Sequence, residues 1–147
     1  MAKPLQFFTS TIGRKMIMAV TGLILAGFVL VHMLGNLQFF ISPEAINAYA
    51  HHLQALPPVI LWGFRAVIAL AVLGHVWSAA TLAKEKVDAR PTPYEVKKNV
   101  QATYASRTMM ISGIILLCFI VFHILHFTVK VAPEKYVPFD YTLHLEG

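Results

Sequence analysis

Three apolar segments of the chain each contain a histidine, at His32, His75 and His123, and the third also contains His126. An ionisable side chain is costly inside a bilayer, so a histidine in such a segment is a functional hypothesis by default. The imidazole ring binds metal ions through a ring nitrogen and titrates near neutral pH. The simpler interpretation is that each histidine only forms a hydrogen bond to a neighbouring helix. Whether the histidines bind a metal or only form hydrogen bonds depends on the depths at which the segments place the three rings.

The composition is that of a membrane protein. Of the 147 residues, 57% are hydrophobic and 13% are charged, and the mean hydropathy is +0.64. A soluble domain of this size is more polar. Three segments reach the length of about 20 residues that a bilayer crossing requires. They predict an all-α membrane protein, one membrane domain over residues 1–147, with a bundle of three transmembrane helices at approximately 17–40, 59–83 and 108–129.

The basic residues are distributed unevenly between the two sides of the predicted membrane. Loop 41–58 is nearly uncharged, whereas nine basic residues precede the first span or lie in loop 84–107. The positive-inside rule then places the N-terminus and loop 84–107 in the cytoplasm. This topology explains the net charge of +5 better than a nucleic acid partner does. The nine residues are Lys3, Arg14, Lys15, Lys84, Lys86, Arg90, Lys97, Lys98 and Arg107.

Two of the three histidines share a predicted depth. At a rise of about 1.5 Å per residue, His32 lies about 8 Å below the outer boundary, and His123 lies at nearly the same level. His75 lies within about 6 Å of the cytoplasmic boundary. Two level imidazoles on neighbouring helices suit the axial positions of a haem iron, with His126 as an alternative to His123. Because Cys118 is the only cysteine, such a haem would be held noncovalently.

Arg65 is a second residue that needs explanation inside a span. Its predicted level is about 9 Å below the outer boundary, which matches the level of His32 and His123. A haem propionate at that depth would be a natural counter-ion. Alternatively, the side chain extends along its helix towards water, as arginines near helix ends do.

Four stretches of the sequence are distinctive when taken together: "TGLILAGFVLVHMLGNLQFF", "NAYAHHLQALP", "GHVWSA" and "YASRTMMISGIILLCFIVFHILHFT". They resemble the cytochrome b membrane subunit of bacterial di-haem succinate dehydrogenases and fumarate reductases, over essentially the whole chain. Members of this family have five membrane helices and four haem-ligating histidines. The resemblance implies that His32 and His123 bind the distal haem, and that His75 binds the proximal haem.

The sequence departs from the family pattern at its end. It stops at Gly147, after "PEKYVPFDYTLHLEG", where the family continues with two more helices and a fourth histidine. The proximal haem would then lack its second ligand. We expect a partial chain rather than a naturally shorter protein, because an inner haem with one protein ligand would be a poor electron relay.

The resemblance also implies a role and partners. A flavoprotein subunit interconverts succinate and fumarate, an iron–sulfur subunit carries the electrons, and this anchor has no catalytic residue of its own. Its haem b groups pass electrons across the bacterial cytoplasmic membrane to or from a quinone, commonly menaquinone. Loop 84–107 is a candidate docking surface, although a loop facing anionic lipid would look the same. His51, His52 and Gln54, with Glu44, are candidates for the quinone site or simply solvated loop residues.

Two other classes of protein stay open. The chain could be the cytochrome b anchor of a hydrogenase or a formate dehydrogenase, which would keep the haem and change the partner. It could instead be a haem-free transporter that binds a metal through its histidines. Such a transporter would be expected to pair histidine with carboxylates or methionine at one depth. The predicted spans contain no Asp or Glu, which favours haem.

Overall fold

A computed structural model describes residues 4–90, 92, 95–96, 100–129 and 131. Within these residues there are helices and no strands, which confirms the predicted all-α class. The chain divides into two units, Met1–Pro93 and Tyr94–Gly147. The elements in order are α1 (Pro4–Thr9), α2 (Thr11–Asn36), the 3₁₀ helix η1 (Leu37–Phe40), α3 (Pro43–Gln54), α4 (Pro58–Asp88), α5 (Tyr104–His123) and the π-helix η2 (Ile124–Val129).

Within the described part of the chain, three helical segments are long and apolar enough to cross a membrane. They are Thr11–Phe40, Pro58–Asp88 and Tyr104–Val129, with 30, 31 and 26 residues. At about 1.5 Å per residue, each is longer than the roughly 30 Å of a hydrocarbon core. Most of their large apolar side chains are exposed, as expected for surfaces that contact lipid. By length and composition, the chain is a multi-pass membrane protein.

The helices extend beyond the predicted spans at one end each. α2 begins at Thr11 rather than near residue 17, α4 continues to Asp88, and α5 begins at Tyr104 rather than near residue 108. Hydropathy marks where contact with lipid ends, whereas helical hydrogen bonds continue through good helix formers such as Lys84 and Glu85. The predicted loop 84–107 is therefore helical at both of its ends. Of the nine basic residues, Lys3, Lys97 and Lys98 lie outside the described residues, as does the stretch 133–147.

Hydroxyl side chains begin three of these helices. In each case the side-chain oxygen accepts a hydrogen bond from the amide three residues later, which would otherwise lack a partner within the helix. The capping oxygens of Ser10, Ser42 and Thr103 lie 3.0, 3.1 and 3.2 Å from the backbone nitrogens of Gly13, Ala45 and Ser106, respectively. The starts of α2, α3 and α5 are thus encoded locally.

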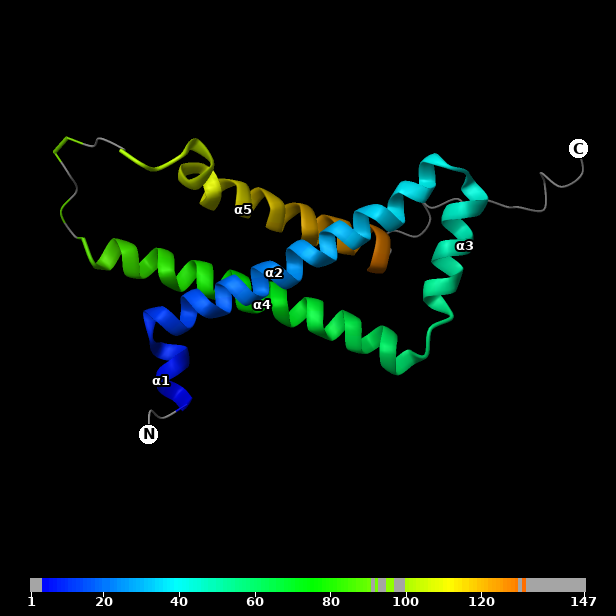
Figure 1. The fold of residues 1–147 in the computed structure, drawn as a ribbon, viewed down its shortest axis with the longest axis horizontal. Helices are drawn as coiled ribbons and strands as arrows, with labels where there is room; N and C mark the ends of the chain where they lie inside the picture. The colour runs from blue at the N-terminus through cyan, green and yellow to red at the C-terminus, as the bar shows by residue number, and fades with distance from the viewer. Residues whose placement is uncertain (1–3, 91, 93–94, 97–99, 130, 132–147) are drawn as a thin grey trace, which may run out of the picture. The chain divides into compact units, whose positions relative to one another are not determined.

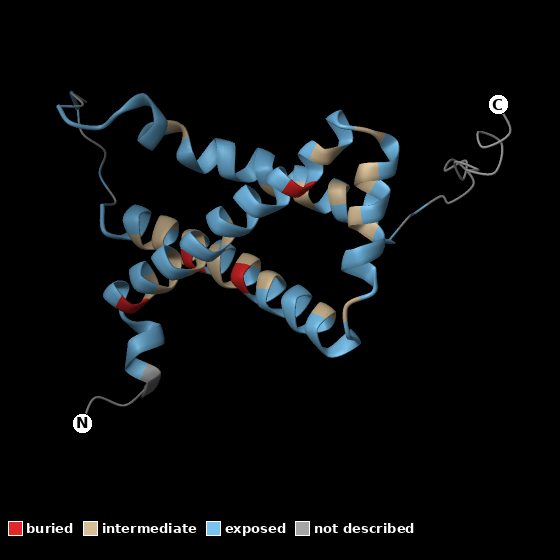
Figure 2. Ribbon diagram, turned by 45° about the vertical axis from the view of Figure 1, so that its right-hand side comes forward, coloured by how far each residue is buried: buried red, intermediate tan, exposed pale blue. Residues whose placement is uncertain are grey.

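In the first unit, α2 and α4 run antiparallel and cross. The N-terminal half of α2 packs against the C-terminal half of α4, and the two helices diverge beyond that contact (Figure 1). Ala71 and Ser78 of α4 are 4% and 0% exposed. The buried parts of α4, red in Figure 2, lie near its crossing with α2. Small side chains let the two helix backbones approach closely. Within lipid there is no hydrophobic force between helices, so close van der Waals packing of this kind holds them together.

α3 lies across the diverging ends of α2 and α4 (Figure 1). Its half-buried residues include Ile46 and Tyr49, whereas Glu44 and His51 are exposed, so the helix is amphipathic. The Tyr49 hydroxyl lies directly against Gly35 of α2, where a Cβ atom would overlap the ring. The three helices therefore form a triangle, with the crossing of α2 and α4 at one corner and α3 as the opposite side.

The second unit contains α5 and η2. No residue of α5 or η2 is buried within the described part of the chain. After His123 the helix changes from α to π, a form that occurs mostly as short segments and often near functional sites. His123 and His126 lie on either side of the change.

Candidate functional site

His75 lies at the crossing of α2 and α4. Its Nδ1 atom is 3.2 Å from Oγ1 of Thr21 on α2. The ring is half-buried, and its Cε1 atom is 3.2 Å from the position that a Cβ atom would take at Gly22. The absence of a side chain at position 22 therefore leaves the imidazole its place beside α2.

The hydroxyl of Thr21 also forms hydrogen bonds within α2. It is 2.6 Å from the carbonyl oxygen of Ile17 and 3.2 Å from that of Met18. Its methyl group faces α4, where a Cβ atom at Gly74 would lie 3.4 Å away. Thr21 thus contacts α4 through both branches of its side chain, with the polar branch directed to His75.

His32 lies much further along α2 than the crossing. It is eleven residues after Thr21, or about 16 Å along the helix axis. The ring is exposed and stacks on Phe28, with ring centres 5.3 Å apart, and Asn36 Nδ2 donates to the His32 carbonyl at 2.7 Å. His32 and His75 therefore belong to two separate levels of the first unit.

Arg65 lies on the other diverging helix, at a level similar to that of His32. It precedes His75 by ten residues, or about 15 Å along α4. The exposed guanidinium lies over the Trp62 ring, 5.0 Å from its centre. Such a cation–π contact orients the side chain and leaves its hydrogen-bond donors available to an anion.

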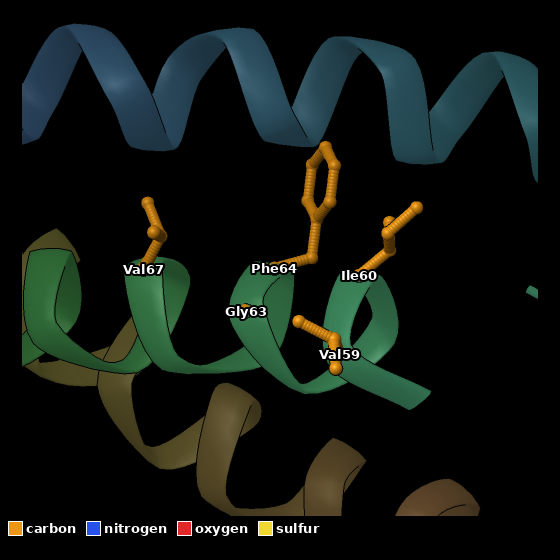
Figure 3. Close-up of a pocket in the computed structure, with 5 residues that line it drawn as sticks. All are labelled: Val59, Ile60, Gly63, Phe64 and Val67. Carbon is orange, nitrogen blue, oxygen red and sulfur yellow. The ribbon is translucent and has the colours of Figure 1, made fainter. Parts of the chain in front are cut away.

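A shallow apolar groove runs along α4 beside Arg65. Its lining residues are Val59, Ile60, Gly63, Phe64 and Val67. The side chains of Ile60, Phe64 and Val67 point towards α2, into the opening between the diverging helices (Figure 3). This surface suits the flat apolar part of a macrocycle or a quinone, or an acyl chain of a lipid.

His123 and His126, on either side of the change from α to π, are flanked by aromatic rings. His123 lies between Phe119 and Phe127, with ring centres 5.6 and 5.0 Å away, and His126 stacks on Phe122 at 5.4 Å. Both histidines are half-buried. The pairing of His32 with His123 joins residues of the two units, and it stays a prediction.

The candidate quinone residues lie on α3. His51, His52 and Gln54 are all exposed. His51 is on the same side of the helix as Glu44, seven residues earlier, and away from Tyr49. A hydrogen bond from the Ser42 side chain, together with one from the backbone amide of Glu44, lowers the pKa of the Glu44 carboxyl below its ordinary value of 4.5. The structure therefore places these residues on a polar surface at the wide end of the triangle.

Two contacts at the crossing were not predicted from the sequence. One is the hydrogen bond between Thr21 and His75. The other is the ion pair of Arg14 with Glu85, at the ends of α2 and α4. A signal for the first exists, because Thr21 lies about 6 Å into the predicted span and His75 lies at the same depth. The second could have been found from opposite charges at one membrane level.

At the crossing a single imidazole, that of His75, could supply one axial ligand to a haem iron. Among the described residues, no three His, Cys, Asp or Glu side chains come together as a group that could hold a metal ion. A haem iron needs no such group, because its porphyrin supplies the equatorial ligands and the protein supplies the axial ones. His75 meets the requirement for one axial ligand, because the neighbouring helix anchors it through one ring nitrogen.

Comparison of the chain with known proteins gave no matching family model, no matching curated protein and no matching solved structure.

Proposed function

We propose that the chain is a haem b-binding membrane anchor subunit of a succinate dehydrogenase or fumarate reductase. It would transfer electrons between a cytoplasmic iron–sulfur subunit and a membrane quinone. The observation that carries the proposal is that His75 and His32 lie at two levels of the first unit. Those levels are about 16 Å apart along α2, within a hydrocarbon core of about 30 Å. Electron transfer slows steeply with distance, so two centres at different depths can relay electrons where one could not.

The residues have separate roles in this proposal. His75 would hold the proximal haem, and His32 with His123 would hold the distal haem. Haem b supplies, when bound, a one-electron redox centre whose potential depends on its axial ligands and surroundings. Arg65, near the level of His32, would bind a propionate and balance its charge. Phe28 limits the rotation of His32, and the apolar groove on α4 keeps water from that side.

The proposal also assigns a direction in the membrane. The N-terminus and the loop after α4 would face the bacterial cytoplasm, where the flavoprotein and iron–sulfur subunits dock. α3 would lie at the outer surface, as amphipathic helices do at a membrane boundary. A quinone, proposed to be menaquinone, would react near this end, where His51, His52 and Gln54 could exchange protons with water.

The experiment that tests the proposal is spectroscopic. The complex, purified from membranes through a tag on this chain, is expected to show a b-type haem in a pyridine haemochrome assay, and succinate is expected to reduce it. The His32→Ala and His75→Ala variants should each lose part of the haem signal. Cys118→Ala, which changes an exposed residue of α5, is the control that should retain all of it. A folded, membrane-inserted complex without haem, or with a haem that succinate leaves oxidised, would contradict the proposal.

A further inference from the structure

We infer that Thr21 is a positioning residue that fixes the tautomer of His75, with the proton on Nδ1 and the lone pair on Nε2. The role of His75 as an iron ligand rests on the proposed function. The tautomer itself is a property of the α2–α4 pair and does not depend on any bound group.

The Thr21 hydroxyl has a single proton, and its position decides what the oxygen offers to His75. A hydroxyl donates one hydrogen bond and accepts up to two. Three acceptors or donors surround this oxygen, at 2.6 Å for the Ile17 carbonyl and 3.2 Å for both the Met18 carbonyl and His75 Nδ1. O–H···O bonds have lengths of about 2.5–3.0 Å, so the Ile17 carbonyl receives the proton. The oxygen then presents a lone pair to His75.

The lone pair of Thr21 determines the state of the imidazole. If Nδ1 also carried a lone pair, two acceptors would face each other with no proton between them. This is unfavourable in the low dielectric of a helix interface within a membrane. With the proton on Nδ1, the ring donates to Thr21 and becomes an anchored group. A neutral imidazole has only one N–H, so Nε2 is left with its lone pair free to bind a metal.

The anchor of His75 comes from a different helix. Metal-binding histidines generally donate their second nitrogen to a neighbouring acceptor, which fixes both the tautomer and the ring orientation. Here the acceptor is on α2 and the ligand is on α4, and Gly22 of α2 limits the position of the ring edge. The orientation of the ligand is therefore coupled to the packing of these two helices.

Two substitutions at position 21 separate the hydroxyl from the shape of the side chain. Thr21→Val keeps the branched shape and removes the hydroxyl, whereas Thr21→Ser keeps the hydroxyl. In membranes without haem, nitrogen-15 NMR of labelled histidine, with the His75 signal identified by its loss in His75→Ala, should show Nδ1–H in the parent and in Thr21→Ser. Thr21→Val should show a mixture or the Nε2–H form. Should Thr21→Val fail to insert, Thr21→Ala takes its place in the same comparison.

Haem binding supplies the second readout. Loss of such an anchor typically reduces metal affinity about 10- to 100-fold. We therefore expect the haem affinity of Thr21→Val to fall by a factor in this range, and that of Thr21→Ser to stay close to the parent value. An unchanged tautomer and unchanged haem affinity in Thr21→Val would overturn the inference and leave the proposed function standing. A tautomer that follows the hydroxyl, in a complex that binds no haem, would overturn the proposed function and leave the role of Thr21 standing.

Discussion

Arg14, near the start of α2, forms an ion pair with Glu85, near the end of α4. The Arg14 guanidinium also donates to the carbonyl of Phe8 at 3.3 Å and lies 5.8 Å from the centre of the Trp77 ring. Thr11 Oγ1 donates to the second carboxylate oxygen of Glu85 at 3.1 Å. The pair therefore connects α1, α2 and α4 at the end of the crossing that is remote from α3.

Removal of one member of this pair should weaken the crossing. The two side chains are 18% and 34% exposed, so a remaining charge is only partly hydrated. We expect Arg14→Gln or Glu85→Gln to lower the free energy of unfolding in detergent by about 1–3 kcal/mol. The double variant should cost less than the sum of the two single changes, because the pair interacts directly. Additive effects in this double-mutant cycle would contradict a direct interaction.

A methyl group at Gly22 should displace His75. In Gly22→Ala the new Cβ atom would lie 3.2 Å from the ring, which is tighter than an ordinary contact, so the imidazole must move by a few tenths of an ångström and its hydrogen bond to Thr21 is disturbed. We expect weaker haem retention, measured by the visible spectrum after gel filtration. Gly27→Ala is the matched control, since within the described residues a Cβ atom at that position would meet no side chain or neighbouring helix within 4 Å. Equal haem retention in the two variants would show that Gly22 is not needed for the placement of the ring.

A methyl group at Gly35 should detach α3 from α2. The Cβ atom would overlap the Tyr49 ring, and overpacking of this kind costs about 1–3 kcal/mol. Gly35→Ala is therefore expected to accelerate amide hydrogen exchange throughout α3. The second change Tyr49→Ala should remove the overlap and return exchange towards that of Tyr49→Ala alone. Gly63→Ala, at a position with open space, should leave α3 unchanged.

If the distal haem is bound as proposed, the charge of Arg65 should raise its reduction potential. A nearby cation favours the reduced form of a haem, which carries one more electron, so Arg65→Gln should lower that potential. Arg65→Lys keeps the charge but loses the planar guanidinium, and it should give a smaller decrease. Redox titration of the haem spectrum measures both. A potential that is the same in all three proteins would place Arg65 away from the haem.

The N-terminus of α3 should depend on the ionisation of Glu44. Because folding lowers the pKa of this carboxyl, its contribution to stability is present above the ordinary value of 4.5 and is lost as the pH falls through the lower folded value. An NMR titration of the Glu44 carboxyl carbon should report the low pKa. In Ser42→Ala, which removes the principal hydrogen bond, the pKa should move back towards 4.5.

The sequence predicted the helices better than it predicted their contacts. The three apolar runs give the correct number of potential spans, and helical rise alone places Arg65 near the level of His32. The faces of α2 and α4 that meet were not predicted, since the spans within both helices consist almost wholly of apolar residues and lipid competes with protein for their surfaces. The contact between Thr21 and His75 depends on that choice of face. The π-helix after His123 likewise follows from hydrogen bonding that residue types do not specify.

The triangle formed by α2, α3 and α4 behaves mechanically as a braced frame. The arms beyond the crossing are about 22 Å in α2, from Thr21 to Asn36, and about 26 Å in α4, from His75 to Pro58, while the α3 brace is about 18 Å. Because α2 and α4 pack together at the crossing and are linked through α3 at their other ends, the angle between them is fixed unless a helix bends or a contact is lost. The length of α3 therefore determines the separation between the parts of α2 and α4 that carry His32 and Arg65. Unwinding of α3 would allow these two parts to move towards each other.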